Sequence, residues 1–239
     1  MSDQQNEYQQ PIGPPLPHWI ARPLPPRSTM LGRYCRVEPV DVERHATDLF
    51  QAFSEAADGR DWTYLFVGPF RDCASYRDYL ITATAGSDPL HHAIIDLASG
   101  KAVGTAALMR IEPAHGVIEV GHITYSPRLQ RTPAATEAMY LMMRRVFDEL
   151  GYRRYEWKCD DKNLRSRAAA ARYGFQFEGI FRQAIVYKGR SRDTAWYSIV
   201  ADEWPVIRGK FEQWLSPVNF DAAGNQIERL SPQISPSLA

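Results

Sequence analysis

The sequence predicts an α/β protein in which a mixed central sheet of about six to seven strands is flanked by helices. Residues 116–150 read as a strand, a turn and an amphipathic helix, and residues 152–159 alternate as a second strand. A strand, helix, strand unit places its two strands parallel in one sheet. Antiparallel strands are expected on both sides of this unit, at 92–97 and 102–111 before it and at 175–187 and 194–200 after it.

Length and composition favour one globular domain with tails. The chain has 239 residues, of which 44% are hydrophobic and 23% are charged, and its 28 basic residues balance 28 acidic ones. This balance gives no reason to expect a nucleic-acid or membrane partner. The three cysteines have no metal-ligand spacing, and no apolar run is long enough to cross a bilayer, so we expect a metal-free cytoplasmic protein.

The domain boundaries follow proline content and pattern. Residues 1–30 are rich in proline and are expected to form an extended arm, residues 31–215 the domain, and residues 216–239 a polar C-terminal tail. The arm contains an apolar anchor at 18–20, which suits contact with the domain or with a second subunit, so a homodimer is an open possibility.

Within the domain, each element has a local signal. A strand is expected at 33–40, a helix from Asp41 to about 58, a second helix at 72–85, a short helix from Asn163 to Tyr173, and a last helix to 215. The loop at 60–70 is unusually aromatic. Its aromatic side chains can fill the core or cover a ligand, and both alternatives stay open.

The central strand and its helix carry the predicted site. On an ideal strand the odd-numbered residues from Val117 to Tyr125 share one face, and His122 lies on the other. Thr132 suits the N-cap of the following helix, and Pro133 suits its first position. Free backbone N–H groups at Ala134 to Thr136, together with Arg128 and Arg131, would form an anion site, although an ordinary capped helix has the same local features.

Two motifs, in order, give a resemblance. Gln130-x-x-Pro133-x-Ala135 is similar to the Q/R-x-x-G-x-G/A pyrophosphate loop of the GCN5-related N-acetyltransferases (GNAT). Asn163-x-x-Ser166, followed by Gly174-Phe175 and Glu178-Gly179, resembles the next helix and strand of that family. Over about residues 33–200, the chain looks closest to the branch of ribosomal-protein alanine and serine N-acetyltransferases (RimJ/RimL-like).

The resemblance implies a GNAT fold with a splayed central pair of parallel strands, and acetyl-coenzyme A as the acyl donor. The residues it assigns to coenzyme binding are Ile123, Tyr125, Gln130, Arg131, Thr132, Ala134, Ala135, Thr136 and Asn163. The aromatic loop borders the acceptor site in this family, which points to Trp62 and Tyr64 as substrate contacts. Two departures stand out: Pro133 replaces a glycine, and Ala170 occupies a position where many members have a tyrosine acid.

Catalysis requires a base for the amine and a proton for the leaving thiolate. Glu119 is the candidate base, because a lone buried carboxylate among apolar residues would be a stronger base than usual, and His122 is its competitor. The resemblance places Ser166 near the coenzyme sulfur, first as a hydrogen-bonding group and second as a proton donor. Tyr125 and Tyr173 are alternative acids.

The predicted function is therefore acetyl transfer to a primary amine of a small molecule, an aminoacyl compound or a protein N-terminus. Two alternatives remain open. One is transfer of another acyl group, such as succinyl, which arginines near the acyl end of the site would favour. The other is a coenzyme-A-binding regulatory module with weak turnover, which Pro133 and Ala170 permit.

Overall fold

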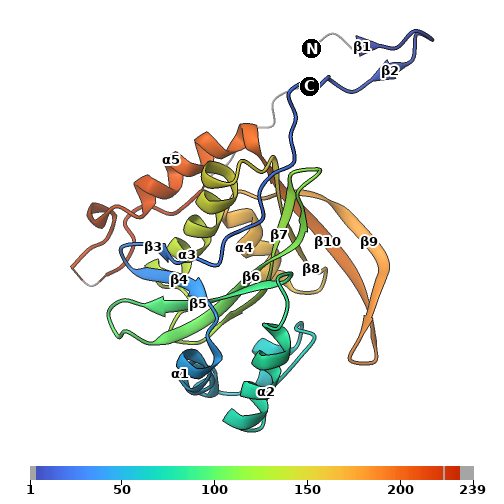
Figure 1. Ribbon diagram of the computed structural model, residues 1–239. Helices are drawn as coiled ribbons and strands as arrows, with labels where there is room; N and C mark the ends of the chain where they lie inside the picture. The colour runs from blue at the N-terminus through green and yellow to red at the C-terminus, as the bar shows by residue number, and fades with distance from the viewer. Residues whose placement is uncertain (1–3, 223, 232–239) are drawn as a thin grey trace.

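The computed structural model describes residues 4–222 and 224–231, and these form a twisted mixed sheet with helices on both faces (Figure 1). Residues 232–239 of the expected tail and 1–3 of the expected arm lie outside the described residues. Within the described part, the main sheet has eight strands in the order β3-β4-β5-β6-β7-β8-β10-β9. They are β3 (Met30–Leu31), β4 (Cys35–Pro39), β5 (Leu90–Asp96), β6 (Ala102–Glu112), β7 (Val117–Tyr125), β8 (Arg154–Asp160), β9 (Gln176–Tyr187) and β10 (Arg190–Val200).

The mixed α/β sheet is confirmed, and the strand beyond the expected number is the two-residue edge strand β3. The five α-helices among the described residues are α1 (Val42–Ser54), α2 (Cys73–Ala83), α3 (Pro133–Arg144), α4 (Leu164–Arg172) and α5 (Trp204–Trp214). Helix α3 continues as a π-helical turn, Arg145–Glu149, and shorter 3₁₀ turns lie at Gly59–Trp62, Ala201–Glu203 and Pro217–Asn219. A two-stranded hairpin, β1 (Gln4–Gln5) with β2 (Pro11–Ile12), opens the arm.

The central strands β7 and β8 are parallel, as predicted, and they separate halfway along. Residues Val117 to Val120 pair with Arg154 to Trp157, and no residue of β7 beyond Val120 pairs with β8 in the described structure. A bulge in β7 accounts for the divergence. Thr105 and Ala107 of β6 pair with Thr124 and Gly121, so two residues of β7 lie opposite one residue of β6.

The bulge also overturns the predicted faces of β7. His122 has a positive φ of 48°, and its ring lies 5.0 Å from the ring of His91. His91 pairs with Ala107, which pairs with Gly121, so the His91 side chain lies on the face of Gly121 and Glu119. The contact between the two rings places His122 on that same face. The prediction that these two side chains point to opposite faces is wrong, since a bulge breaks the period of two.

The same shift moves Tyr125 away from Glu119. Tyr125 pairs with Gly104 and packs against the core beneath α3, where its Oη donates a hydrogen bond to the Ala135 carbonyl at 3.3 Å. The sheet thus has one face toward α3, α4 and α5 and another toward α1 and α2, with a hydrophobic cluster on each.

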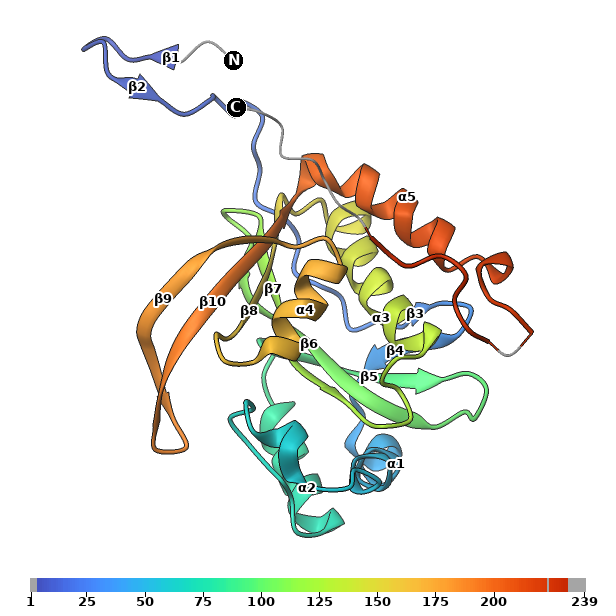
Figure 2. The same cartoon turned by 180° about the vertical axis from the view of Figure 1, so that it is seen from behind.

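Strand β10 begins earlier than predicted. Pairs such as Arg192 with Ile185 extend the β9–β10 hairpin to a turn at Lys188 and Gly189, both of which have positive φ, as tight hairpin turns require. The polar composition of 190–193 hid this part of the strand. Figure 2 shows the tip of the hairpin extending beyond the rest of the sheet, toward the level of α2.

The proline-rich arm contacts the domain through Trp19. Its Nε1 donates to the Ala114 carbonyl at 2.8 Å, and the Arg22 guanidinium lies 4.4 Å from its ring centroid. Gly116 makes room for this ring, since a Cβ there would lie 2.5 Å from a Trp19 carbon. No helix among the described residues has the length and hydropathy of a membrane span.

Candidate active site

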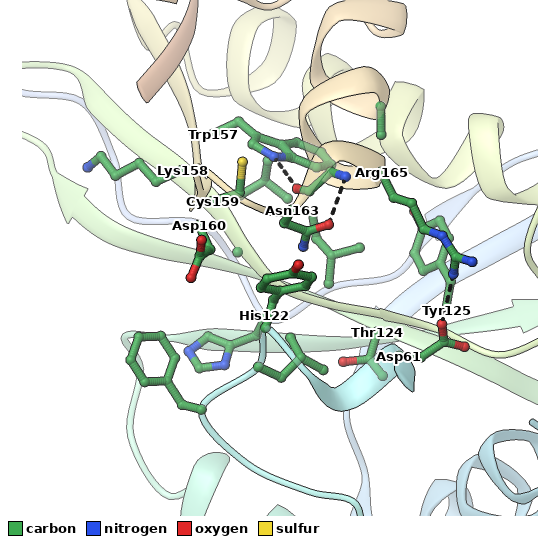
Figure 3. Close-up of a pocket in the computed structure, with 18 of the residues that line it drawn as sticks. Asp61, His122, Thr124, Tyr125, Trp157, Lys158, Cys159, Asp160, Asn163 and Arg165 are labelled. Atoms are coloured by element: carbon green, nitrogen blue, oxygen red, sulfur yellow. Dashed lines mark hydrogen bonds and ion pairs between the residues drawn. The ribbon is translucent and has the colours of Figure 1, made fainter. Parts of the chain in front are cut away.

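A cavity of about 1300 Å³ lies where β7 and β8 separate. Its walls come from β6, β7, β8 and β10, from the start of α4, and from the aromatic loop at 60–67. Figure 3 shows His122 on one wall, Lys158, Cys159 and Asp160 on another, and Asp61 with Arg165 at one end. Because pockets for a single small ligand are typically about 300–1,000 Å³, this cavity has room for two reactants.

The start of α3 stands at one end of the cavity. Thr132 and Pro133 take the predicted N-cap and first helical positions, and the Thr132 hydroxyl accepts a hydrogen bond from Ala135 N at 3.2 Å. The prediction of three free N–H groups from Ala134 to Thr136 is therefore wrong at Ala135, whose N–H is engaged by the cap.

The predicted coenzyme residues separate into two groups. Six line the cavity, namely Ile123, Tyr125, Gln130, Arg131, Ala135 and Asn163. The other three do not line it, namely Thr132, Ala134 and Thr136. Arg131 is exposed at the cavity rim, with a positive φ of 64°, and no ion pair is recorded for it among the described residues.

Gln130 anchors the loop rather than projecting freely. Its Nε2 donates to the Tyr125 carbonyl at 2.8 Å and to the Asp61 carboxylate at 3.1 Å. Asp61 also accepts a hydrogen bond from Arg165 at 3.2 Å. Sequence reasoning missed Asp61, which had no distinct signal beyond its place in the aromatic loop, and the fold brings it to the end of the cavity.

Ser166 lies at the start of α4 in a hydrogen-bonded set. Its N–H donates to the capping Asn163 side chain at 3.1 Å, and its Oγ accepts from the Trp157 indole at 3.0 Å (Figure 3). Burial raises the pKa of the Cys159 thiol, and a hydrogen bond from Ser166 offsets part of that rise. Asn163 and Trp157 thus fix the backbone and the Oγ of Ser166.

The alternative acids are less available. Burial raises the pKa of Tyr125 well above its usual value, and burial also raises the pKa of Tyr173. The Tyr125 hydroxyl is already committed to the Ala135 carbonyl. Ala170 is fully buried, so its position does not reach the cavity.

Glu119 lies on the cavity wall and is 3% exposed. Arg110 Nη1 contacts both of its oxygens, at 2.8 and 2.7 Å, and Lys158 Nζ lies 2.9 Å from one of them. Lys158 also pairs with Glu156 at 2.7 Å. The expectation of a lone carboxylate among apolar residues is wrong, because pairing across strands brings two cations to it.

Two imidazoles share this wall with Glu119. Burial lowers the pKa of His91 to about 4, with a further contribution from His122. Burial also lowers the pKa of His122, and the Arg110 charge lowers it further. Both rings are therefore neutral at pH 7, and each has a nitrogen lone pair that can accept a proton.

The aromatic loop both fills the core and covers the cavity. Trp62 is mostly buried, with its ring edge-on to Phe53 and Phe70 at 5.5 and 5.4 Å, yet it also lines the cavity. Tyr64 reaches across the cavity, and its Oη donates to the Lys162 carbonyl at 3.1 Å. Both alternatives for this loop therefore apply: Trp62 packs in the core and lines the cavity, and Tyr64 lines the cavity.

The β9–β10 hairpin fastens the loop in place. Lys188 Nζ donates to the Trp62 carbonyl at 2.9 Å and to the Gly68 carbonyl at 3.0 Å, and Arg190 donates to the Thr63 carbonyl at 2.7 Å. These contacts hold the loop over the end of the cavity. Among the described residues, no cluster of three His, Cys, Asp or Glu side chains is arranged to hold a metal ion.

Comparison with known proteins agrees with this geometry. Residues 36–176 match the model of an acetyltransferase (GNAT) domain. A GCN5-related N-acetyltransferase from Brucella melitensis is 50% identical, with a TM-score of 0.88, over 90% of this chain and 97% of its own. A probable acetyltransferase of the GNAT family from Chromobacterium violaceum ATCC 12472 is 40% identical, with a TM-score of 0.76, over 82% of this chain and 98% of its own.

A more distant structure has a bound coenzyme. The ribosomal-protein alpha-N-acetyltransferase RimL, in complex with coenzyme A, is 18% identical, with a TM-score of 0.58, over 73% of this chain and 99% of its own. At this identity the likeness concerns the fold alone. No protein with a curated function is significantly similar to the chain.

Proposed function

The chain belongs to the GNAT family of acetyltransferases, and from that premise we propose that it transfers the acetyl group of acetyl-coenzyme A to a primary amine by direct attack of the amine on the thioester. One observation carries the proposal. A single cavity joins the capped start of α3 to the wall that holds Glu119, through the gap between β7 and β8. Both reactants can therefore meet without a covalent enzyme intermediate.

The residues at the α3 end suit coenzyme A. Beyond Val120 the β8-facing edge of β7 has no strand partner in the described structure, so its backbone groups can pair with the amides of the pantetheine arm. The small side chain of Ala135 permits close approach, and the Arg131 cation and the positive end of α3 suit the pyrophosphate. Family members use acetyl-coenzyme A, which supports this donor.

We propose that the amine loses its proton to Glu119 through water. Arg110 and Lys158 orient the carboxylate on the cavity wall. The bulge gives His122 equal access to the same space, with a neutral ring, and this makes it the second candidate. A decisive comparison is Glu119→Gln against His122→Asn, since asparagine tolerates the positive φ at 122.

Ser166 is proposed to hydrogen-bond the departing coenzyme sulfur. Trp157 and Asn163 fix its Oγ and its backbone, and its hydroxyl lies beside Cys159 at the cavity. A serine hydroxyl is a weak acid, so stabilisation of the thiolate precedes proton donation. Trp62 and Tyr64 are proposed to border the acceptor, since both line the cavity beneath the aromatic loop.

The acceptor is a small-molecule, aminoacyl or peptide amine. Peptides with a free N-terminus belong in this class because the structural neighbour RimL is itself an alpha-N-acetyltransferase of a ribosomal protein, although that likeness concerns the fold. The first experiment is calorimetric titration with acetyl-coenzyme A, followed by a thiol-release assay over amino acids, polyamines, aminoacyl nucleotides and short peptides. Binding with release for one amine class supports the proposal. Binding without release for any amine favours the regulatory module, and no binding refutes the coenzyme site.

A further inference from the structure

Arg192 on β10 is a buried cation that lines the cavity and is 6% exposed. Its Nε donates to the Thr194 hydroxyl at 3.2 Å. For its two Nη nitrogens no hydrogen bond is recorded among the described residues, and no carboxylate of that part of the chain lies within ion-pair distance of it. A guanidinium placed this deep on a cavity wall gains from an anionic partner, because the partner replaces the hydration that burial removes.

The nearby acids are already engaged. Asp160 lies on the next strand, and its carboxylate accepts from the Tyr187 hydroxyl at 2.7 Å and from Lys162 N at 2.8 Å. The second buried cation of the cavity, Lys158, has two carboxylates, Glu119 and Glu156. Arg192 therefore differs from Lys158 in having no carboxylate within ion-pair distance among the described residues.

The surroundings of Arg192 suit a planar anion. The guanidinium carbon lies 5.6 Å from the ring centroid of Phe66 and 6.0 Å from that of Tyr187, so aromatic groups flank it. A guanidinium fork offers two parallel N–H groups to a carboxylate, and such charge-assisted pairs are stronger in a water-poor site.

The position of Arg192 on the sheet indicates that its anionic partner belongs to the acceptor amine and not to the coenzyme. Trp196 pairs with Lys158, and Thr194 pairs with Asp160, so Arg192, two residues before Thr194, shares the face of Lys158 and its partner Glu119. Tyr125 packs beneath α3 on the opposite face. In the proposed function the donor enters at α3, and the space in front of Arg192 is left to the amine.

We propose that the amine accepted by this enzyme carries a carboxylate, which Arg192 binds, so that the substrates are amino acids or acidic peptides rather than polyamines. The inference rests on the proposed acetyl transfer. It assigns to Arg192 the choice of acceptor, while Glu119 and Ser166 serve the reaction itself.

The test uses pairs of acceptors that differ in one carboxylate and have nearly the same amine. Suitable pairs are glycyl-aspartate amide with glycyl-asparagine amide, and a tripeptide with its C-terminally amidated form. Thiol release from acetyl-coenzyme A gives kcat/KM for each member. The variants are Arg192→Gln, Arg192→Lys and the control Arg182→Gln, which removes an exposed arginine of the same hairpin outside the cavity.

The wild-type chain and Arg182→Gln should prefer the acid member of at least one pair by about 10- to 100-fold, as expected for a charged hydrogen-bonded pair. Arg192→Gln should reduce this preference to about twofold or less while leaving the amide member unchanged, and Arg192→Lys should restore part of it. Equal use of acids and amides by the wild-type chain, or a preference that persists in Arg192→Gln, overturns the inference.

Two further measurements distinguish this inference from a carboxylate on the acyl group and from failure of the proposed acetyl transfer. If Arg192→Gln impairs only the use of succinyl-coenzyme A, the carboxylate belongs to the acyl group and the acceptor assignment is wrong. If acetyl-coenzyme A binds but no amine releases thiol, the proposed function fails, and calorimetric titration of the acid and amide probes decides the role of Arg192. Binding of the acid alone, lost in Arg192→Gln, supports it, and equal or absent binding overturns it.

Discussion

Replacing Glu119 with glutamine tests whether this carboxylate accepts the amine proton or only balances two cations. Glutamine keeps the size of the side chain and can still accept hydrogen bonds from Arg110 and Lys158, but it is a far weaker proton acceptor. If Glu119 is the base, kcat should fall by about 10²- to 10⁴-fold, the usual contribution of a positioned general base. The dissociation constant of acetyl-coenzyme A should change by less than about twofold, because Glu119 lies apart from the α3 end.

The structure also gives the expected cost in stability. Lys158 keeps Glu156 at 2.7 Å, and the Arg110 side chain is 49% exposed, so neither cation is left buried and alone. The free energy of unfolding should therefore fall by only about 1–2 kcal/mol. For a chain of this size, that corresponds to a melting temperature lower by about 2–8 °C.

Glu156→Gln is the matched control. Glu156 contacts the same Lys158 and its side chain is also buried, at 9% exposed against 4% for Glu119, but it does not line the cavity. The variant should lose similar stability and keep kcat within about threefold of the wild-type value. Steady-state thiol release from pH 6 to 9, with calorimetry for coenzyme affinity, measures each quantity. A kcat for Glu119→Gln that equals that of Glu156→Gln at every pH would refute the base assignment.

Three further predictions concern the remaining parts of the site. Arg131→Glu should weaken acetyl-coenzyme A binding by about tenfold or more through lost attraction to the phosphates, and calorimetry showing unaltered affinity would remove Arg131 from the coenzyme site. Ser166→Ala should lower kcat by about 3- to 30-fold, since the leaving thiolate loses one hydrogen bond, while coenzyme affinity stays within about twofold; an unchanged single-turnover rate would contradict the role. Because burial lowers the pKa of His91 from 6.5 to about 4, its contribution to folding is complete above pH 6.5 and is lost as the pH falls toward 4. Thermal melts should show a stability loss on the order of 2–3 kcal/mol over this range that His91→Gln reduces, and identical pH profiles would contradict it.

Local patterns were sufficient for most of the fold. Thr132 and Pro133 identify the start of α3 because the N-cap and first-turn preferences involve neighbouring residues only. The parallel arrangement of β7 and β8 followed from one strand, helix, strand unit. Strand β10 was partly missed, since residues 190–193 are polar and are paired only by the distant strand β9.

The sequence identified several residues of the site but not the side chains that they contact. Glu119 was found on the central strand, but its partners were not, because Arg110 and Lys158 belong to the two strands on either side of it. The alternation rule placed His122 on the face opposite Glu119, because the rule does not account for the extra residue of a bulge.

The family, the order of the elements and the capped helix at the proposed coenzyme site could be predicted from the sequence, since each depends on residues close together in the chain. The set of side chains that meet in the cavity depends on the folded arrangement of the strands. Strand pairing and the β7 bulge bring His91, His122 and Glu119 to one wall of the cavity. The β9–β10 hairpin brings Arg192 to the cavity, where it has no carboxylate within ion-pair distance among the described residues. The burial and charge of such groups depend on neighbours far away in the chain, and these properties decide their chemistry.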